Sequence, residues 1–344
     1  MPATLDRFSR PLTDLRISVT DRCNLRCPYC MPREVFGPGF SFMARDELLT
    51  FEEIARVCRV LARLGVSKIR LTGGEPLLRR ELEQLVAMLA TIDGIDDIAL
   101  TTNGTLLASK ARVLKQAGLR RVTVSLDALD EGVVRAMSDS RVSLASVLRG
   151  IESASNAGLA PVKVNTVVRR GVNDHCVLSI AEHFRHRPET LRFIEYMDVG
   201  TTNGWQPGEV VPASELIAAI AQRWPLEGLA PTRDGEVATR YRYRDGAGEI
   251  GFIQSVSRPF CGECTRARMS AEGKLYTCLF ATRGCDVRAM LRGGLGDRAL
   301  EEELRRTWQA RADRYSAERF AVDGRTETSL GAAAPKIEMS YIGG

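Results

Sequence analysis

The most constraining feature of this 344-residue sequence is a rhythm of short β-rich runs and longer helical periods that fills its first two thirds. The runs alternate with amphipathic segments, several of which end at a glycine, as helix C-termini prefer. Six βα units in succession imply a parallel sheet, either an open doubly wound sheet or part of a barrel. The predicted strands are 15–19, 68–72, 97–102, 121–126, 161–168 and 191–196.

The two faces of these strands favour the barrel. A parallel strand covered by helices on both sides is nearly continuous in Val, Ile and Leu. These strands alternate instead, as where Arg70 lies between Ile69 and Leu71. An edge strand with one solvated face explains one or two such cases, but not five or six. We therefore predict an α/β fold with an incomplete (β/α)6 barrel, in which helices cover the apolar faces and polar, basic faces line a lumen.

The character of the chain changes after about residue 200. A loop rich in Gly and Pro precedes a predicted helix at 213–223, and a β-like stretch at 240–256 and a charged helix at 296–312 follow. We predict two domains, a barrel at 1–225 and a smaller C-terminal α+β module at 226–344. Composition fits a globular protein, with 44% hydrophobic and 26% charged residues.

Targeting signals and charge runs are missing from the sequence. No apolar run approaches the ~20 residues of a membrane span, and the first twenty residues contain no apolar signal core. The net charge of +5 is scattered rather than gathered in a stripe. We therefore expect a cytoplasmic protein that binds neither membrane nor nucleic acid.

Three of the nine cysteines stand close together just after the first predicted strand. Disulfides are disfavoured in the cytosol, so clustered cysteines there favour metal binding or catalysis. Cys23, Cys27 and Cys30 form Cys-x3-Cys-x2-Cys, with no histidine or fourth cysteine nearby. A structural zinc site closes a shell of four ligands, whereas three thiolates leave one position open for a ligand. The alternative is three buried thiols that pack as small hydrophobic groups.

A second set of cysteines follows late in the chain, at Cys261, Cys264 and Cys278. Arg266 and Arg268 alternate on one strand face directly after the first two. With Cys285 as a fourth ligand, this set is also compatible with a zinc ribbon-like site. We interpret Cys285 as a bystander, like the two isolated cysteines, Cys58 and Cys176.

The first cysteine motif resembles the signature of the radical S-adenosylmethionine (SAM) enzymes, and Gly73-Gly74-Glu75-Pro76 after the second strand resembles their GGEP motif. The resemblance implies a partial βα barrel and a [4Fe–4S] cluster on Cys23, Cys27 and Cys30. A fourth iron would bind the amino and carboxylate groups of SAM. The expected SAM contacts, including Asn103 from its place at a strand end, are Tyr29, Gly74, Glu75, Asn103, Ser125 and Met197.

Longer stretches resemble one family within this superfamily, the GTP 3′,8-cyclases of molybdenum cofactor biosynthesis. They include 15–27, 68–76, 101–104, 193–198, the late cysteine segment and the terminal Gly343-Gly344. The resemblance implies a second [4Fe–4S] cluster on Cys261, Cys264 and Cys278, whose open iron meets the guanine. The expected GTP contacts, with Lys68 and Arg192 as additional basic ones, are Arg16, Lys68, Arg70, Thr101, Lys163, Arg192, Arg266 and Arg268.

The chemistry that the resemblance implies is a lyase reaction. SAM is cleaved reductively, the 5′-deoxyadenosyl radical takes the hydrogen at C3′ of GTP, and C3′ bonds to C8 to give 3′,8-cyclo-7,8-dihydro-GTP. Arg16 is expected to assist the final reduction, and Gly343 and Gly344 to thread into the active site. Implied partners are an external electron donor and the next enzyme of the molybdopterin pathway. The sequence does not determine the oligomeric state, and a homodimer is one option.

The residues themselves point the same way. Cations on inward strand faces are costly if buried unpaired, and a bound triphosphate would pair them. Available acids such as Glu75, Asp127 and Glu195 could satisfy only some of them. Two alternatives stay open: a radical SAM peptide maturase with an auxiliary cluster, and a non-enzymatic zinc or iron–sulfur module.

Overall fold

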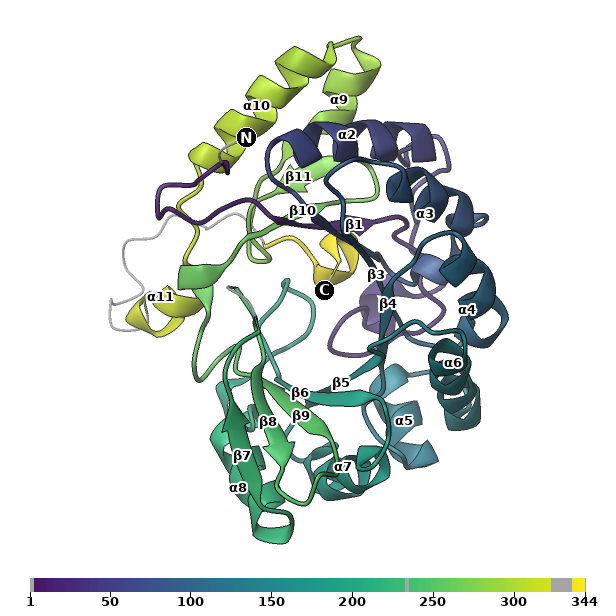
Figure 1. The fold of residues 1–344 in the computed structure, drawn as a ribbon, viewed down its shortest axis with the longest axis vertical. Helices are drawn as coiled ribbons and strands as arrows, with labels where there is room; N and C mark the ends of the chain where they lie inside the picture. The colour runs from purple at the N-terminus through teal and green to yellow at the C-terminus, as the bar shows by residue number, and fades with distance from the viewer. Residues whose placement is uncertain (1–2, 233–234, 323–335, 344) are drawn as a thin grey trace.

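In the computed structural model, which describes residues 3–232, 235–322 and 336–343, the chain is built around one long curved sheet (Figure 1). Its central strands run parallel and in chain order, each beside the next. They are β1 (Asp14–Ser18), β2 (Lys68–Thr72), β3 (Asp97–Thr102), β4 (Arg121–Ser125), β5 (Lys163–Val168) and β6 (Thr190–Glu195). The predicted incomplete (β/α)6 barrel is confirmed.

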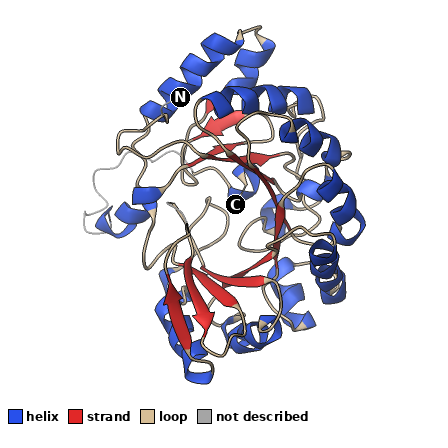
Figure 2. Cartoon of the chain, viewed as in Figure 1, coloured by secondary structure: helices blue, strands red, loops and turns tan. Residues whose placement is uncertain are grey.

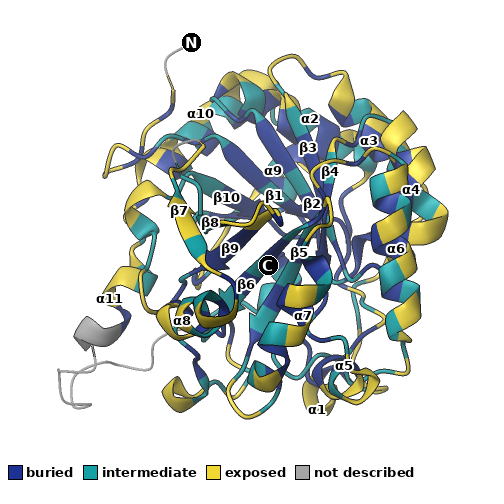
Figure 3. Cartoon of the chain, turned by 60° about the horizontal axis from the view of Figure 1, so that its bottom comes forward, coloured by how far each residue is buried: buried dark blue, intermediate teal, exposed yellow. Residues whose placement is uncertain are grey.

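Helices cover the outer side of this sheet, and the strands form an arc around the interior (Figure 2). Leu15, Ile17 and Ile69 are fully buried against them, which is why one face of each strand is apolar. Figure 3 shows the buried strands at the centre and the exposed residues on the outer helices. The covering helices are α2 (Phe51–Arg63), α3 (Leu82–Ala90), α4 (Leu107–Gln116), α5 (Glu131–Ser138), α6 (Leu144–Asn156) and α7 (Val177–Phe184).

The C-terminal strands extend the same sheet at both edges. β10 (Arg266–Met269) pairs in parallel with β1, and β9 (Glu249–Ile253) pairs in parallel with β6. Among the described strands the order is β12-β11-β10-β1-β2-β3-β4-β5-β6-β9-β8-β7. The region after 226 thus continues the barrel wall instead of forming a separate layer. The added outer strands are β7 (Leu226–Leu229), β8 (Thr239–Tyr243), β11 (Lys274–Tyr276) and β12 (Cys285–Asp286).

The remaining helices flank the barrel, and one lies inside the arc. Figure 1 shows the C-terminal α12 (Met339–Ile342) within the curve of the sheet, whereas the N-terminal segment runs beside α10 (Asp297–Gln309). In the described part of the chain, no helix is both long and apolar enough to cross a membrane. The other helices are α1 (Arg33–Phe36), α8 (Ala213–Arg223), α9 (Val287–Arg292), α11 (Tyr315–Val322) and the 3₁₀ turns η1 (Pro76–Leu78), η2 (Asp174–Cys176), η3 (Pro207–Glu209) and η4 (Cys261–Glu263).

Local sequence signals predicted most elements, with shifted ends. A capping box begins α2, because the Thr50 side chain accepts from Glu53 N–H and the Glu53 side chain accepts from Thr50 N–H. The strand predicted at 161–168 begins only at Lys163, since Pro161 has no N–H to donate to a ladder. The β-like stretch at 240–256 is the hairpin β8–β9, and α5 and β7 were not predicted.

Candidate active site

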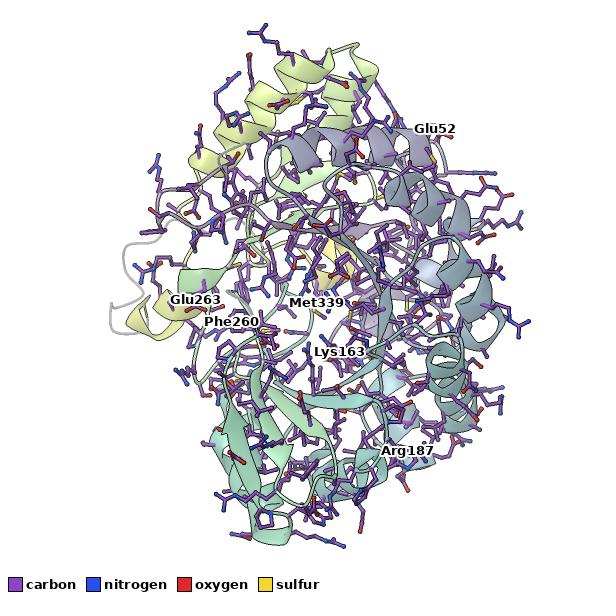
Figure 4. The ribbon with its side chains drawn as sticks, viewed as in Figure 1. Glu52, Lys163, Arg187, Phe260, Glu263 and Met339 are labelled. Atoms are coloured by element: carbon purple, nitrogen blue, oxygen red, sulfur yellow. The ribbon has the colours of Figure 1, made fainter. Side chains whose placement is uncertain are left out.

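Both cysteine sets open onto one cavity inside the arc of strands. Its lining includes side chains from the ends of β1 to β6, from β10 and from α12. In Figure 4, the labelled Lys163, Phe260 and Met339 lie toward this interior, and Glu52 and Arg187 lie on the outside. The cysteines that line the cavity are Cys23, Cys27, Cys30, Cys261, Cys264 and Cys278.

The first cysteine loop follows β1 and holds its thiols half-buried against the cavity. Burial raises the pKa of Cys23 to about 11 and that of Cys30 to about 12, so an isolated thiolate is disfavoured there. Iron binding supplies the positive charge that makes such thiolates stable. The donor set therefore fits a cluster that Cys23, Cys27 and Cys30 would hold.

The second set has a different electrostatic environment. Burial raises the pKa of Cys278 to about 11. Burial acts in the same direction on Cys264, but the guanidinium groups of Arg266 and Arg311 outweigh it and bring the pKa of that thiol down to about 6. Arg266 Nη2 donates to Cys264 Sγ at 3.3 Å. In the described part of the chain, no three His, Cys, Asp or Glu side chains are grouped to hold a single metal ion, and three thiolates on different irons of a cubane need no such grouping.

Gly73 and Gly74 pack directly against the backbone of the first cysteine loop, so neither position has room for a side chain. A Cβ on Gly73 would lie 2.5 Å from the Thr20 carbonyl oxygen, and one on Gly74 would overlap the Arg22 carbonyl. Gly74 N–H donates to Thr20 O at 2.9 Å, and Glu75 N–H donates to Arg22 O at 2.8 Å. The missing side chains therefore let the GGEP turn pack against the start of the first cysteine loop.

The Glu75 side chain ties this turn to the end of β3 by hydrogen bonds. Its buried carboxylate accepts from the Thr102 hydroxyl at 2.7 Å, from Asn103 N–H at 2.7 Å and from Leu77 N–H at 3.0 Å. Asp127 acts similarly at the end of β4, accepting from the Tyr29 hydroxyl at 2.7 Å and from Val167 N–H at 2.9 Å. Tyr29, expected at SAM, is thus oriented by Asp127.

The buried Glu75 gives a pH dependence that can be measured on metal-free protein. Burial raises its pKa from 4.5 to about 7, against the three hydrogen bonds that it accepts. The folded state then binds more protons than the unfolded state, so stability falls as pH rises from 4.5 to 7, by about 3 kcal/mol. We expect Glu75→Gln to remove this fall in denaturant unfolding at pH 5 and pH 8.

A control of opposite sign is available at Glu53. Its pKa is lowered by the side-chain hydrogen bond from Arg292, so its contribution is present above pH 4.5 and is lost as pH falls. Glu53→Gln should therefore weaken the protein more at high pH than at low pH. An unchanged pH slope in Glu75→Gln would contradict the prediction.

A row of arginines crosses the cavity wall on three neighbouring strands. The register pairs Arg16 with Arg70 on one side and with Arg268 on the other. Burial lowers the pKa of Arg16, and the nearby guanidinium groups of Arg268 and Arg266 lower it further. Burial and Arg266 also lower the pKa of Arg268, to about 10. This row therefore carries positive charge that its own neighbours repel.

The two lysines predicted at GTP have different surroundings. Lys68 forms a buried ion pair with Asp14, which stands opposite it on β1, and it does not line the cavity. Lys163 does not line it either, but burial and the nearby Arg192 lower its pKa to about 6. Glu195, considered as a partner for such cations, accepts instead from Ala213, Val256 and Ser257 N–H groups at 2.8 Å.

The structure brings most predicted contacts to the cavity. All six residues expected at SAM line it, and so do six of the eight expected at GTP; these are Tyr29, Gly74, Glu75, Asn103, Ser125, Met197, Arg16, Arg70, Thr101, Arg192, Arg266 and Arg268. Met197 follows the end of β6. Cys285 lies in β12 and does not line the cavity, and Cys58 and Cys176 are buried elsewhere. Sequence reasoning missed Arg10, Phe260, Arg311 and Asp313, which no motif marks.

The described part of the C-terminal segment, residues 336–343, reaches the arginine row at Gly343. Arg268 Nη1 donates to the carbonyl of Gly343, whereas Gly344 lies outside the described residues. Polar contacts at the end of β6 hold this segment in place. Lys336 Nζ donates to Asp198 Oδ2 at 2.8 Å, and Glu338 accepts from Thr201 N–H at 2.8 Å. Contacts along the segment thus bring Gly343 to β10.

The comparisons with known proteins agree with this geometry. The Radical SAM superfamily model matches residues 17–184, and the Molybdenum Cofactor Synthesis C model matches residues 189–317. Two structures of SuiB from Streptococcus suis, one bound to S-adenosylmethionine and one to a precursor peptide, share the fold with TM-scores of 0.58 and 0.60. Their sequences are 16% and 13% identical to this chain. The matched regions cover 87% and 88% of this chain and 66% of each SuiB chain. Fold and cysteine motif define a radical SAM enzyme.

Curated relatives narrow this class. A GTP 3′,8-cyclase of Acidothermus cellulolyticus is 54% identical, one of Xanthomonas axonopodis pv. citri is 50% identical and one of Staphylococcus aureus is 48% identical. Each comparison covers 98% of this chain and 98% of the relative. The chain belongs to the GTP 3′,8-cyclase family.

Proposed function

We propose that this enzyme converts GTP to (8S)-3′,8-cyclo-7,8-dihydroguanosine 5′-triphosphate, an early step of molybdenum cofactor biosynthesis. The observation that carries the proposal is the row of Arg16, Arg70 and Arg268 on the wall of a cavity that both cysteine sets share. Cations that repel one another when buried are stabilised by a polyanion, and guanidinium groups suit phosphate oxygens. A nucleoside triphosphate supplies that charge.

The chain's residues would divide the work along the cavity. Cys23, Cys27 and Cys30 would hold the first cluster, and Tyr29, Gly74, Glu75, Asn103, Ser125 and Met197 would surround SAM. When bound, this cluster and SAM supply the radical that removes a hydrogen atom from the nucleotide. Cys261, Cys264 and Cys278 would hold the second cluster near the guanine.

The basic residues bind and orient the substrate in this proposal. Arg16, Arg70, Arg192, Arg266 and Arg268, with Lys163 and Thr101 beside them, would hold the triphosphate and ribose so that C3′ faces the SAM side. Holding the reacting atoms in place supplies rate by proximity, and the enclosing wall keeps water from reactive species. Arg16 would also assist the closing reduction, whereas Lys68 is paired with Asp14 and does not line the cavity.

The test is product analysis under anaerobic conditions with reductant, SAM and GTP deuterated at C3′. We expect cyclised product by mass spectrometry, with the deuterium in 5′-deoxyadenosine. Guanosine lacks the charge that the arginine row binds, so its kcat/KM should fall at least about 100-fold. Deoxyadenosine formation that GTP does not stimulate would contradict the proposal.

Two alternatives have their own outcomes in this experiment. Stimulation by a peptide but not by GTP would favour a peptide maturase, and zinc without iron in anaerobically purified protein would favour a non-enzymatic metal module. We further propose that an external electron donor supplies electrons in the cytoplasm, and that the product passes to the next enzyme of the pathway. A homodimer is the assembly to test by sedimentation.

A further inference from the structure

Three segments that are distant in sequence meet behind the second cysteine set. They are the N-terminal turn from Asp6 to Arg10, the 3₁₀ turn η4 that carries Cys261, and the segment after α10 that carries Arg311. Figure 1 shows the N-terminal segment beside α10. Trp308 Nε1 donates to the Arg10 carbonyl at 3.1 Å, which joins the N-terminal turn to the end of α10, just before the segment that carries Arg311.

Arg10 ties this junction to the first cysteine of the set. Its Nη1 donates to the carbonyl oxygen of Cys261 at 2.7 Å and to that of Asp313 at 3.0 Å. Its Nε donates to Asp6 Oδ2 at 2.6 Å. The Arg10 side chain is 2% exposed, so these contacts are made away from solvent.

Arg311 makes the matching contact to the second cysteine. Its Nη1 donates to the carbonyl oxygen of Cys264 at 2.7 Å and to Asp6 Oδ2 at 3.1 Å. The guanidinium also lies 4.5 Å from the ring centre of Trp308, and the side chain is 1% exposed. One buried carboxylate, Asp6, therefore orients two arginines, and each arginine holds the backbone of one cysteine.

The junction combines two guanidinium groups with two carboxylates. Asp6 is fully buried between Arg10 and Arg311, and Asp313 pairs with Arg311 at 3.7 Å while it accepts from Thr277 at 2.6 Å. Within the described residues, Arg10 Nη2 is buried without a hydrogen-bond acceptor, and both arginines line the cavity. A buried donor of this kind is costly unless an anionic acceptor occupies the cavity beside it.

We propose that Arg10 and Arg311 are positioning residues for the second cluster: they hold the Cys261 and Cys264 backbone and place positive charge behind it, which stabilises its reduced form. The inference rests on the proposed second [4Fe–4S] cluster. Hydrogen bonds and nearby charge tune the potential and retention of metal centres through such outer contacts. The negative charge of Asp6 partly cancels the positive charge of Arg10 and Arg311, so Asp6 lowers the positive potential at the cluster.

The sign of the effect separates this role from a purely structural one. Arg311→Gln removes a positive charge and should move the reduction potential of the second cluster to more negative values. Asp6→Asn removes the opposing negative charge and should move the potential the other way. If the two variants only damaged the local structure, there would be no reason for their reduction potentials to shift in opposite directions.

The experiment uses the full chain with reconstituted clusters. Redox titration followed by electron paramagnetic resonance is made in a Cys27→Ser background, so that only the second cluster contributes. Iron retention against a chelator is measured in parallel, and Arg311→Gln should lose the second cluster 10- to 100-fold faster. Arg314, exposed and three residues away, provides the matched control Arg314→Gln, which should change neither quantity.

The outcomes are separable. An unchanged potential and unchanged iron retention in Arg311→Gln would overturn the inference, as would shifts of the same sign in Arg311→Gln and Asp6→Asn. Where Arg311→Gln fails to retain any cluster, Arg10→Gln replaces it in the titration, with the same negative shift expected. Wild-type protein that holds about four irons instead of about eight would refute the second cluster itself, and with it the proposed function.

Discussion

Serine in place of Cys27 is expected to abolish the reductive cleavage of SAM, with 5′-deoxyadenosine formation falling at least about 1000-fold. The thiol lies in the loop that would hold the first cluster, and a cluster that loses one of three protein ligands is not retained. Iron content should fall from about eight to about four per chain, because the second cysteine set is carried by other segments. Iron analysis and chromatography of the nucleoside products measure both effects.

Two further serine variants control this result. Cys264→Ser should also lose about four irons, but it should still cleave SAM, since the first loop is intact. Cys285→Ser should keep about eight irons and full activity, because Cys285 lies in β12 and does not line the cavity. Normal SAM cleavage in Cys27→Ser would show that the first set is not the cluster site.

Alanine at Gly343 is expected to lower cyclisation about 100-fold while leaving the iron content unchanged. Gly343 has φ +70° and lies against β2, so a Cβ there would overlap Thr72 Cγ2. The Gly343 carbonyl would then move away from Arg268, and a displacement of about 1 Å at an active site costs about 100-fold in rate. Rates of product formation with saturating GTP and SAM test this.

The strain of a positive φ must be separated from the overlap. Gly294 has φ +81° with nothing within 4 Å of a Cβ, so Gly294→Ala carries the backbone cost alone and should keep normal turnover. Thr72→Ser removes the overlapping methyl group and should restore part of the activity of Gly343→Ala. Equal losses in Gly294→Ala and Gly343→Ala would show that the fit of the tail against Thr72 is irrelevant.

Local patterns were sufficient to predict much of the barrel. The strands at 68–72 and 97–102 and the helix at 213–223 have the predicted ends, because their periodicity and their flanking turns are encoded within a few residues. The alternation of polar and apolar residues also predicted the lumen correctly, since adjacent side chains of a strand point to opposite faces. Cysteine spacing identified the six thiols that the cavity collects.

Partners across the sheet were beyond the reach of these patterns. Asp14 was placed outside the first strand, yet the register of β1 with β2 sets it opposite Lys68 and pairs the two charges. The late strands β9 and β10 belong to the predicted C-terminal module, and backbone hydrogen bonding to β6 and β1 makes them extend the barrel wall, which the local patterns did not indicate. Pairing of this kind depends on long-range geometry, which local periodicity does not record.

By itself, the sequence determined the βα order, the polar lumen and the two thiolate sets, because spacing along the chain decides which side chains share a strand face or a loop. Only the tertiary structure decided which charges meet. It paired Lys68 with Asp14, aligned Arg16 between Arg70 and Arg268, and brought Asp6, Arg10 and Arg311 behind Cys261 and Cys264. The physical reason is that buried charges and backbone donors must find partners in three dimensions, and those partners come from segments far apart in the chain.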